Sequence, residues 1–380
     1  MIYLDNSATT YPKPQGVRQA VQRALTEQGA NPGRSGYGMC LRTTQGVFRV
    51  REQAAELFGA PGPECVSFQP SCTQALNLVL KGVLRPGDHV VVSDLEHNAV
   101  MRPLEALKSR GVTYTAAAVT PGDNDATLDA FRHAIGPKTR LAVCTMASNV
   151  FGIRLPVERI TALCHQYGVR VCVDAAQGAG LFRINVMESG IDYLCCAGHK
   201  GLYGPQGTGG LCVREGVEIA PLLFGGSGIQ SYLKTQPSGM PGRLEAGTQN
   251  GHGLAGLAAG MEFVLRTGIR RIGEREQTLA RRFYEGIRSI PGIRVYGDVQ
   301  APDHTGVVSF NLEGWDSGET ADELARRFSI ACRPGAHCAP LMHEALGTRE
   351  QGAVRFSFSW FNTEEEIEEG IRAVACLAEE

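Results

Sequence analysis

Short apolar runs alternate with amphipathic segments along the first two thirds of the chain. The runs HVVVSD, RLAVCT, VRVCVD, YLCCA and GGLCV have the length of strands and lie between residues 89 and 213. Segments between or beside them, such as MRPLEALKSRG and LPVERITALCHQYG, carry apolar residues at helical spacing. This alternation predicts an α/β fold in which a mainly parallel sheet is covered by helices on both faces.

The pattern changes after about residue 265, where helices outnumber strands. A long charged amphipathic segment over residues 270–290 precedes the apolar run GVVSFNL, the helical segment GETADELARRFSI, the run AVRFSFSW and a last helix that starts at Thr363. This set of elements is typical of a small α+β domain. We therefore expect a large α/β domain over residues 15–265 and a smaller α+β domain over residues 266–380, to which residues 1–14 also belong.

Composition limits the classes of protein to consider. With 380 residues, 43% of them hydrophobic, the chain can bury a sizeable core. Its formal net charge is -2 and it has no dense block of Lys and Arg, which disfavours nucleic acid or an anionic membrane as a partner. The start MIYLDNSATT lacks the pattern of a signal peptide, and no apolar run has the roughly 20 residues of a membrane helix. We expect a soluble cytoplasmic protein.

Polar side chains follow several of the predicted strands. They are Thr73, His97, Asn149, Asp174, Gln177, His199 and Lys200. Ligands of such sheets bind outside the carboxyl ends of the strands, although a single Asp or Asn there is more often a turn or cap residue. Lys200 lies among Gly198, Gly201 and Gly204. We expect its amine to enter a crowded, partly dry space, where the neutral and nucleophilic form is favoured.

Pyridoxal phosphate would explain this set of residues. The cofactor needs a lysine for a Schiff base, here Lys200, and an acid for its ring nitrogen, here Asp174. Its phosphate needs backbone amides at the start of a helix, which PSCTQALNLVLKG supplies around Cys72 and Thr73. The ring of His97 offers a plane on which the cofactor can stack.

The stretch CRPGAHCAPLMH places two cysteines and two histidines in one loop. Zinc is disfavoured, because His337 and Cys338 are adjacent and the spacing is not that of the usual Cys and His pairs. A disulfide between Cys332 and Cys338 would close a very small loop in a reducing compartment, and most of the 12 cysteines are expected to be reduced core residues. A nucleophile agrees better with a Gly/Pro loop, a neighbouring histidine and a helix-like segment that follows.

Six motifs together resemble those of one family. YLDNSATT, EHNAV, VDAAQGAG, AGHKGLYGPQGTGG, RLEAGTQN and RPGAHCAP are similar to motifs of class V aminotransferase-fold cysteine desulfurases, in their SUF-type and selenocysteine-lyase-like branch. The resemblance runs from Tyr3 to about Thr363. It implies a fold type I pyridoxal-phosphate enzyme that is a homodimer with active sites at the subunit interface.

The resemblance also implies a role for each residue. The catalytic residues would be Lys200, Cys338 and His97, and the cofactor would be bound by Cys72, Thr73, His97, Asn149, Asp174, Gln177, His199 and Lys200, with Thr248 supplied by the neighbouring subunit. Asp174 would hold the ring nitrogen, Gln177 the ring hydroxyl, and Thr73 and His199 the phosphate. Asn149 and Arg355 would bind the carboxylate of the amino acid, which suits a guanidinium group. No metal is expected.

The reaction implied is the conversion of L-cysteine to L-alanine, with the sulfur taken by Cys338 as a persulfide and passed to an acceptor protein or a small thiol. Two positions depart from the family pattern: Ala197 stands where relatives commonly have Ser or Thr, and Tyr37 where a histidine is common. A selenocysteine lyase, a sulfide-releasing cysteine lyase and a transaminase remain alternatives on the same fold. A Rossmann oxidoreductase is disfavoured because GPQGTGG precedes a strand, and a cysteine-rich metal or scaffold protein is the alternative without catalysis.

Overall fold

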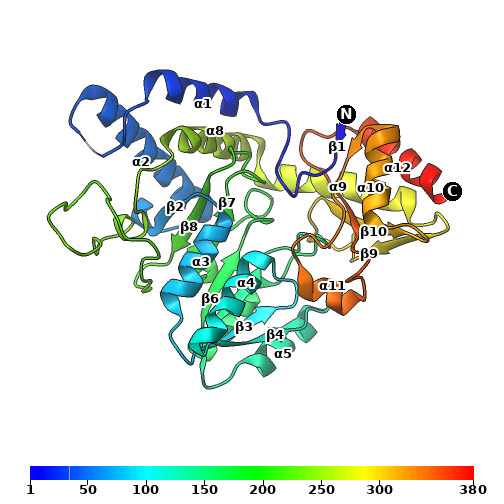
Figure 1. Cartoon of the computed structure of the whole chain (residues 1–380), viewed down its shortest axis with the longest axis horizontal. Helices are drawn as coiled ribbons and strands as arrows, with labels where there is room; N and C mark the ends of the chain where they lie inside the picture. Colours follow the sequence, from blue (N-terminus) through cyan, green and yellow to red (C-terminus); the bar gives the residue numbers. More distant parts are fainter. Residues whose placement is uncertain (34) are drawn as a thin grey trace.

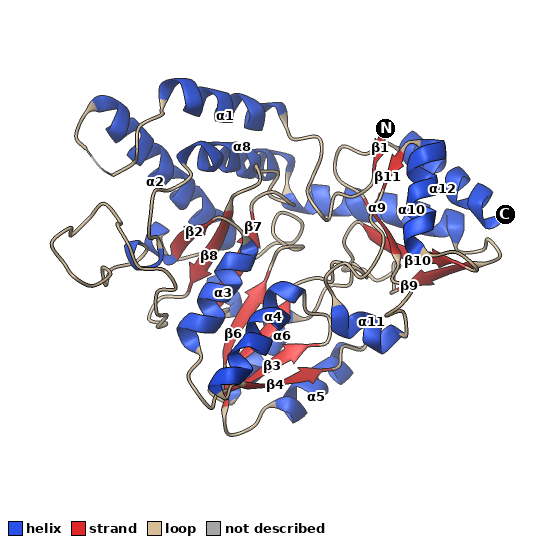
Figure 2. Ribbon diagram, viewed as in Figure 1, coloured by secondary structure: helices blue, strands red, loops and turns tan. Residues whose placement is uncertain are grey.

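A seven-stranded sheet forms the centre of the protein (Figure 2). The computed structural model describes residues 1–33 and 35–380. The strands are β2 Val66–Gln69, β3 His89–Ser93, β4 Thr113–Ala117, β5 Thr139–Thr145, β6 Arg170–Asp174, β7 Tyr193–Ala197 and β8 Gly209–Val213. Their order is β2-β8-β7-β6-β5-β3-β4. The five strands from β7 to β4 are parallel, and β8 runs antiparallel to both of its neighbours.

Both faces of this sheet are buried. Along β3, Val91 belongs to one hydrophobic core, whereas Val90 and Val92 belong to the other. The helices α3 Cys72–Val83 and α4 Asn98–Leu107 complete the second core. The first core is completed by α2 Gly38–Phe58, α5 Asn124–Ala134, α6 Val157–Gln166 and α8 Gly251–Thr267, and α1 Gln15–Glu27 packs on α8. The expected α/β fold with a mainly parallel, doubly covered sheet is therefore confirmed.

A second, smaller sheet lies beyond residue 290. It is antiparallel, with the order β12-β10-β9, and consists of β9 Ile293–Tyr296, β10 Val307–Leu312 and β12 Val354–Ser357. It packs with α9 Ile269–Ile287, α10 Ser317–Phe328 and α12 Glu364–Ala378. The rings of Phe283, Phe310 and Phe356 meet in this core. The elements expected after residue 265 are present, and the expected domain boundaries stay a prediction.

The N-terminal segment runs between the two sheets (Figure 1). Its strand β1 Ile2–Tyr3 pairs in parallel with β11 Ile330–Ala331, and the side-chain amide of Asn6 donates a 2.9 Å hydrogen bond to the carbonyl oxygen of Ser357. A few residues later the segment reaches the end of β7, where the hydroxyl of Thr10 donates to the carbonyl of Lys200 at 3.1 Å. Residues 1–13 therefore join the small sheet to the edge of the large one.

Two further expectations concern cysteines and membranes. All twelve cysteines are free, and nine of them are buried, so most are core residues as expected. Throughout residues 1–33 and 35–380, no helix combines the length and the apolar character needed to cross a bilayer.

Candidate active site

One cavity of about 90 Å³ lies at the carboxyl ends of β5, β6 and β7, beside the first turns of α3 and α4. It is lined by Ser71, Cys72, Thr73, His97, Ala99, Thr145, Asn149, Asp174, Ala176, Gln177, Ala197, His199 and Lys200. The position agrees with the rule that ligands of parallel sheets bind at the carboxyl ends of strands. The structure thus brings together the strand-end residues that the sequence singled out.

Lys200 follows β7 and is the amine of this cavity. Burial lowers its pKa, and the positive charges of Arg355 and Arg333 act in the same direction. The carboxylate of Asp174 opposes this shift, but the net effect is a pKa below that of an ordinary lysine. The neutral amine, which is the nucleophilic form, is therefore favoured more than in a solvated lysine.

Asp174 ends β6 and is buried. Its Oδ1 accepts hydrogen bonds from the backbone N–H of Ala176 at 2.9 Å and from the thiol of Cys72 at 3.3 Å. Burial, followed by the charge of Asp174, raises the pKa of the Cys72 thiol well above its usual value. Cys72 is therefore held as a neutral thiol that donates to Asp174.

The starts of α3 and α4 line the cavity, and each is capped by a side chain. Ser71 is the N-cap of α3, because its Oγ accepts from the backbone N–H of Gln74 at 3.2 Å. His97 caps α4 in the same way, since its Nδ1 accepts from the N–H of Ala99 at 3.0 Å. This bond leaves the ring proton of neutral His97 on Nε2. Burial lowers the pKa of His97, so the neutral ring is favoured.

The peptide of His199 is held by the N-terminal segment. Its carbonyl oxygen accepts hydrogen bonds from Lys13 Nζ at 2.7 Å and from the hydroxyls of Thr9 and Thr10 at 3.1 and 3.3 Å. Burial, with the charges of Lys200 and Lys13, lowers the pKa of His199 to about 4, so its ring is neutral near pH 7. The buried Nδ1 of this ring has no hydrogen-bond partner among the described residues.

Cys338 lies on a loop tied to the start of α4. Its carbonyl oxygen accepts from the backbone N–H of Asn98 at 2.7 Å, and its φ of 57° is in the left-handed region. The preceding residue His337 also has a left-handed φ, and its carbonyl accepts from the side-chain amide of Asn149 at 2.8 Å. The guanidinium of Arg333 lies 4.0 Å from the sulfur of Cys338. Hydrogen bonds from Asn98 and Asn149 therefore fix the turn that carries the thiol of Cys338.

The imidazole of His337 supports the same turn. Its Nε2 is 3.0 Å from the carbonyl oxygen of Arg333 and its ring stacks on that of His343, with centroids 6.0 Å apart. Burial and the charge of Arg355 lower the pKa of His337 to about 3.

Among the described residues, no group of three or more His, Cys, Asp or Glu side chains is placed to hold a metal ion.

Arg355 lies in β12 and is fully buried. One nitrogen donates to Asp5 Oδ1 at 2.7 Å and another to the carbonyl oxygen of Asn149 at 3.0 Å. The structure therefore places Arg355 against Asn149 and pairs it with a carboxylate of its own chain. Their shared role in binding a substrate stays a prediction.

Three other positions lie outside or at the rim of this arrangement. Thr248 is exposed, is bonded at 3.3 Å to the side chain of Asn31 and does not line the cavity. Tyr37 is the N-cap residue of α2 and is also exposed. Ala197 does line the cavity, so a methyl group stands where a hydroxyl of Ser or Thr would donate a hydrogen bond.

Sequence reasoning missed two cations of this site. Lys13 has a pKa that burial lowers to about 8, and it binds the peptide next to Lys200. Arg333 opens the stretch RPGAHC, in which only the cysteines and histidines were considered. Arg333 belongs to the quoted motif RPGAHCAP, and Lys13 lies three residues after YLDNSATT, so the signal was their proximity to those motifs.

A mainly parallel sheet with a partly buried lysine at its carboxyl edge and a small α+β part define the type I fold of pyridoxal-phosphate enzymes. The aminotransferase class-V family model matches residues 2–369, and the chain belongs to this family. The resemblance and the fold class predicted from the motifs are thereby confirmed.

Within that family the chain is similar to proteins named cysteine desulfurases. A probable cysteine desulfurase of Methanothermobacter thermautotrophicus is 35% identical over 97% of this chain and 92% of its own length. A cysteine desulfurase of Klebsiella pneumoniae is 34% identical over 97% of this chain and 91% of its own length. The apo structure of the cysteine desulfurase from Thermococcus onnurineus superimposes with a TM-score of 0.92 at 32% identity, covering 100% of this chain and 94% of the other.

Proposed function

We propose that the chain is a pyridoxal-phosphate-dependent cysteine desulfurase, which converts L-cysteine to L-alanine and takes the sulfur onto Cys338 as a persulfide. One observation carries this proposal. The amine of Lys200 and the carboxylate of Asp174 line the same cavity as His97, and the backbone of Cys338 is bonded to Asn98, the residue after His97. The start of α4 therefore contacts both the cavity that suits an aldehyde cofactor and the loop that carries the thiol of Cys338.

The residues of the cavity fit the cofactor. Lys200 would hold it through Nζ, Asp174 would face the ring nitrogen, His97 would stack on the ring and Gln177 would meet the ring hydroxyl. The start of α3 would take the phosphate with Cys72, Thr73 and His199, and the buried Nδ1 of His199 has no other partner among the described residues. When bound, pyridoxal phosphate supplies a ring that accepts electrons from the α-carbon of an amino acid.

The side chains of this protein supply the proton transfer and the nucleophile. Nζ of Lys200, whose neutral form is favoured by burial, takes the proton from the α-carbon of cysteine. Sγ of Cys338, as the thiolate, attacks the sulfur of the substrate. A sulfur–sulfur bond forms and the carbon–sulfur bond breaks. The carbon skeleton keeps the electron pair, takes up protons and leaves as alanine, while the persulfide remains on Cys338.

Asn149 and Arg355 are proposed to bind the substrate carboxylate. They already contact one another, and a guanidinium has five N–H donors, of which Asp5 and the Asn149 carbonyl engage two. The ε N–H of Arg355 is buried and has no partner in the described part of the chain. Donors therefore remain for an anionic ligand.

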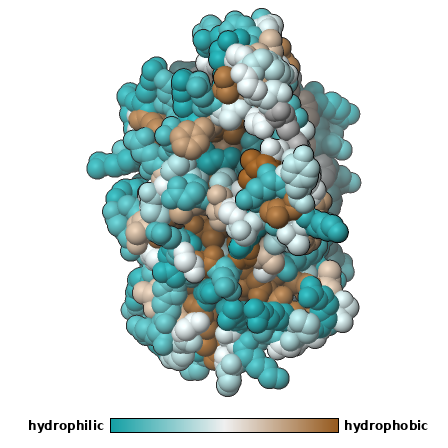
Figure 3. Space-filling model, turned by 90° about the vertical axis from the view of Figure 1, so that its left-hand side faces the viewer, coloured by the Kyte–Doolittle hydropathy of each residue, from teal (hydrophilic) through white to brown (hydrophobic). Residues whose placement is uncertain are grey.

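The protein is proposed to be a homodimer in which Thr248 completes the site of the neighbouring subunit. Thr248 is exposed and outside the cavity of its own chain. Large apolar side chains are exposed on α2 and on the loops before Thr248, namely Met39, Leu41, Phe48, Leu223, Phe224, Ile229, Tyr232 and Leu233. The side of the molecule on which α2 lies shows apolar atoms at its surface (Figure 3). Large apolar side chains exposed on one side of a molecule are typical of protein interfaces.

The protein is further proposed to work in the reducing cytoplasm, since all twelve cysteines are free. The sulfur would pass from Cys338 to an acceptor protein or a small thiol.

The proposal is tested by the products and by the colour of the purified protein. With L-cysteine and a thiol it should form alanine in an amount equal to the sum of sulfane sulfur and of the sulfide that the thiol releases from it, and borohydride should bleach its visible band. Lys200→Ala should have no band that borohydride bleaches, whereas Lys81→Ala, at an exposed lysine of α3, should keep it. Free sulfide with no alanine, or activity with selenocysteine only, would contradict the proposal.

A further inference from the structure

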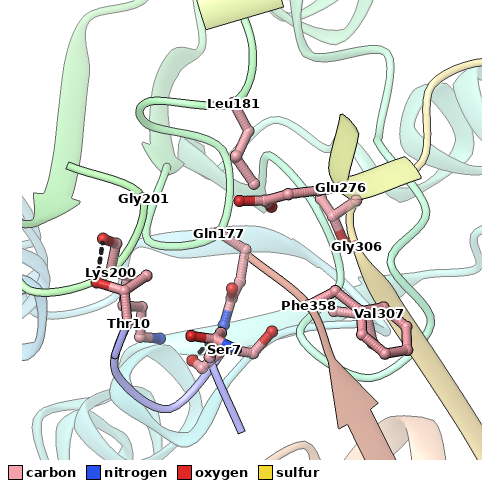
Figure 4. A pocket seen from close by; sticks show the side chains of 12 residues that line it. Ser7, Thr10, Gln177, Leu181, Lys200, Gly201, Glu276, Gly306, Val307 and Phe358 are labelled. Carbon is pink, nitrogen blue, oxygen red and sulfur yellow. Dashed lines mark hydrogen bonds between the residues drawn. The ribbon is translucent and has the colours of Figure 1, made fainter. Parts of the chain in front are cut away.

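A second cavity, of about 20 Å³, lies behind Lys200 and Gln177 (Figure 4). It is lined by Asn6, Ser7, Thr10, Gln177, Leu181, Lys200, Gly201, Glu276, Thr305, Gly306, Val307 and Phe358. These residues come from the N-terminal segment, from the loops after β6 and β7, from α9 and from the small sheet. Polar and apolar side chains line the cavity together, and it has room for about one water molecule. It is therefore the place where the small sheet meets the peptide that carries Lys200.

The carboxyl group of Glu276 points from α9 into this cavity, toward Gln177 (Figure 4). The side chain is buried, and burial raises its pKa to about 8, so the carboxyl group is neutral near pH 7. A Cβ at Gly306 would come within 2.9 Å of the Cβ of Glu276. The start of β10 therefore packs directly on Glu276 and leaves its side chain little freedom.

Glu276 is bonded to Tyr203. The hydroxyl of Tyr203 lies 3.3 Å from Oε1 of Glu276 and accepts from the backbone N–H of Trp360 at 3.2 Å. The ring is fully buried and packs edge-on against Phe263 and Phe361, with centroids 5.1 and 5.9 Å apart. Both the ring and the hydroxyl of Tyr203 are thus fixed by elements that lie outside the loop after β7.

Tyr203 in turn closes the loop that carries Lys200. Its backbone N–H donates to the carbonyl of Lys200 at 2.8 Å, and the N–H of Gly204 donates to the carbonyl of Gly198 at 2.7 Å. The φ of Tyr203 is 56°, in the left-handed region, which costs a non-glycine residue about 1 kcal/mol or more. An anchored side chain is what keeps such a conformation populated.

We propose that the buried carboxyl group of Glu276 is a positioning residue for Lys200, and that it acts through the hydroxyl of Tyr203 on the loop over residues 198–204. The proposal rests on the role of Lys200 in the proposed function. Glu276 and Tyr203 keep the loop closed, and the closed loop keeps the amine of Lys200 away from bulk water. Loss of the link exposes the amine and returns its titration toward that of an ordinary lysine.

The experiment measures how readily Lys200 is acetylated as a function of pH. The full-length protein is treated with hydroxylamine to release bound aldehyde, pulsed with acetic anhydride and analysed by peptide mass spectrometry. Tyr203→Phe and Glu276→Leu should raise the midpoint of Lys200 labelling by about half a pH unit or more, because water then reaches the amine. Glu276→Gln keeps an acceptor for the tyrosine hydroxyl, so its midpoint should stay near that of the wild type.

Tyr193→Phe is the matched control for Tyr203→Phe. Tyr193 is equally buried, but its hydroxyl donates to the carbonyl of Glu218 at 2.8 Å and lies at the opposite end of β7. Its loss should lower the melting temperature without moving the midpoint for Lys200. If Tyr203→Phe has the same midpoint of Lys200 acetylation as the wild type, the proposal is overturned. Tyr203→Phe alone decides the question if Glu276→Leu does not fold. The labelling needs no enzymatic turnover, so a failure of the desulfurase assignment is recognised separately.

Discussion

The backbone N–H of Asn98 donates a 2.7 Å hydrogen bond to the carbonyl oxygen of Cys338. Asn98 is the first residue of α4 and follows His97, whose ring lines the main cavity. The thiol that we propose as the sulfur acceptor is therefore placed by the same helix start that places the stacking ring.

Asn98→Pro should displace Cys338 while leaving the rest of the site in place. Proline is tolerated at the first position of a helix, and His97 already has the extended conformation that precedes proline. The variant loses the donor to Cys338 and should keep its fold and cofactor, but persulfide formation should fall about tenfold or more because the sulfur is displaced. Stopped-flow measurement of the first turnover checks this.

Asn124→Pro is the control, since Asn124 is the first residue of the surface helix α5. An equal loss of persulfide formation in both proline variants would show that the hydrogen bond to Cys338 has no special part in the reaction.

Cys338→Ala should retain the cofactor and its absorbance change with L-cysteine, but form no alanine. After reaction with L-cysteine and alkylation, the wild type should carry one extra sulfur on the peptide of Cys338. Burial raises the pKa of Cys72 and Cys195 well above the usual value, and that of Cys196 to about 12, so these thiols stay protonated and should carry none. Undiminished alanine formation by Cys338→Ala would contradict the persulfide mechanism.

Mixed dimers should reveal whether Thr248 serves the neighbouring subunit. Lys200→Ala and Thr248→Ala each impair both sites of a homodimer. In a hybrid, one site combines the intact Lys200 of one chain with the intact Thr248 of the other, so mixing the two variants should restore desulfurase activity above that of either alone. Activity that stays at the average of the two parents after subunit exchange would assign Thr248 to its own chain or to no site.

Glu96→Gln should change how stability depends on pH. Glu96 is fully buried between Ser93 and Thr145, and burial raises its pKa from 4.5 to about 8. The carboxyl group of Glu96 thus ionises at a lower pH in the unfolded chain than in the native protein. The free energy of unfolding of the wild type therefore falls as the pH rises toward 8, whereas Glu96→Gln lacks this contribution. Relative to the wild type, the variant should gain at least about 1 kcal/mol between about pH 5 and about pH 8.

Urea unfolding at both pH values measures this difference, and Glu52→Gln, at an exposed position on α2, controls for the loss of one carboxyl group. A pH-independent difference between wild type and Glu96→Gln would show that Glu96 is ionised in the native protein.

The large sheet and most of the cavity were predictable from local sequence. β7 and β8 have the bounds of the runs YLCCA and GGLCV, because glycine follows the first short apolar run and begins the second. The rule on strand ends then selected Asp174, His97 and Lys200 without knowledge of the tertiary structure. The sequence does not distinguish Ser71 from Thr73 as the capping residue of α3, since both carry a hydroxyl, and the geometry assigns the cap to Ser71.

Contacts between distant segments were not predictable in this way. Nothing local in the sequence pairs Arg355 with Asp5, or directs Glu276 of an amphipathic helix toward the loop of Lys200. The helical pattern of residues 270–290 marks Glu276 as one charge among many, and only tertiary packing buries it. β9 was missed because a run of only four residues, with one exposed and one buried side chain, is too short to form a recognisable alternation.

The N-terminal segment has a consequence for synthesis of the chain. Asn6 is bonded to Ser357, 351 residues further along, and β1 has its partner in β11. A ribosome therefore releases the first strand long before its partner exists, while all strands of the large sheet lie between residues 66 and 213 and can pair earlier. Thr10 and Lys13 hold the peptide beside Lys200, and their partners are available as soon as the large sheet exists, whereas the partners of β1 and Asn6 come last. A nascent chain stalled before residue 330 would carry the sheet but lack the contacts that finish the site.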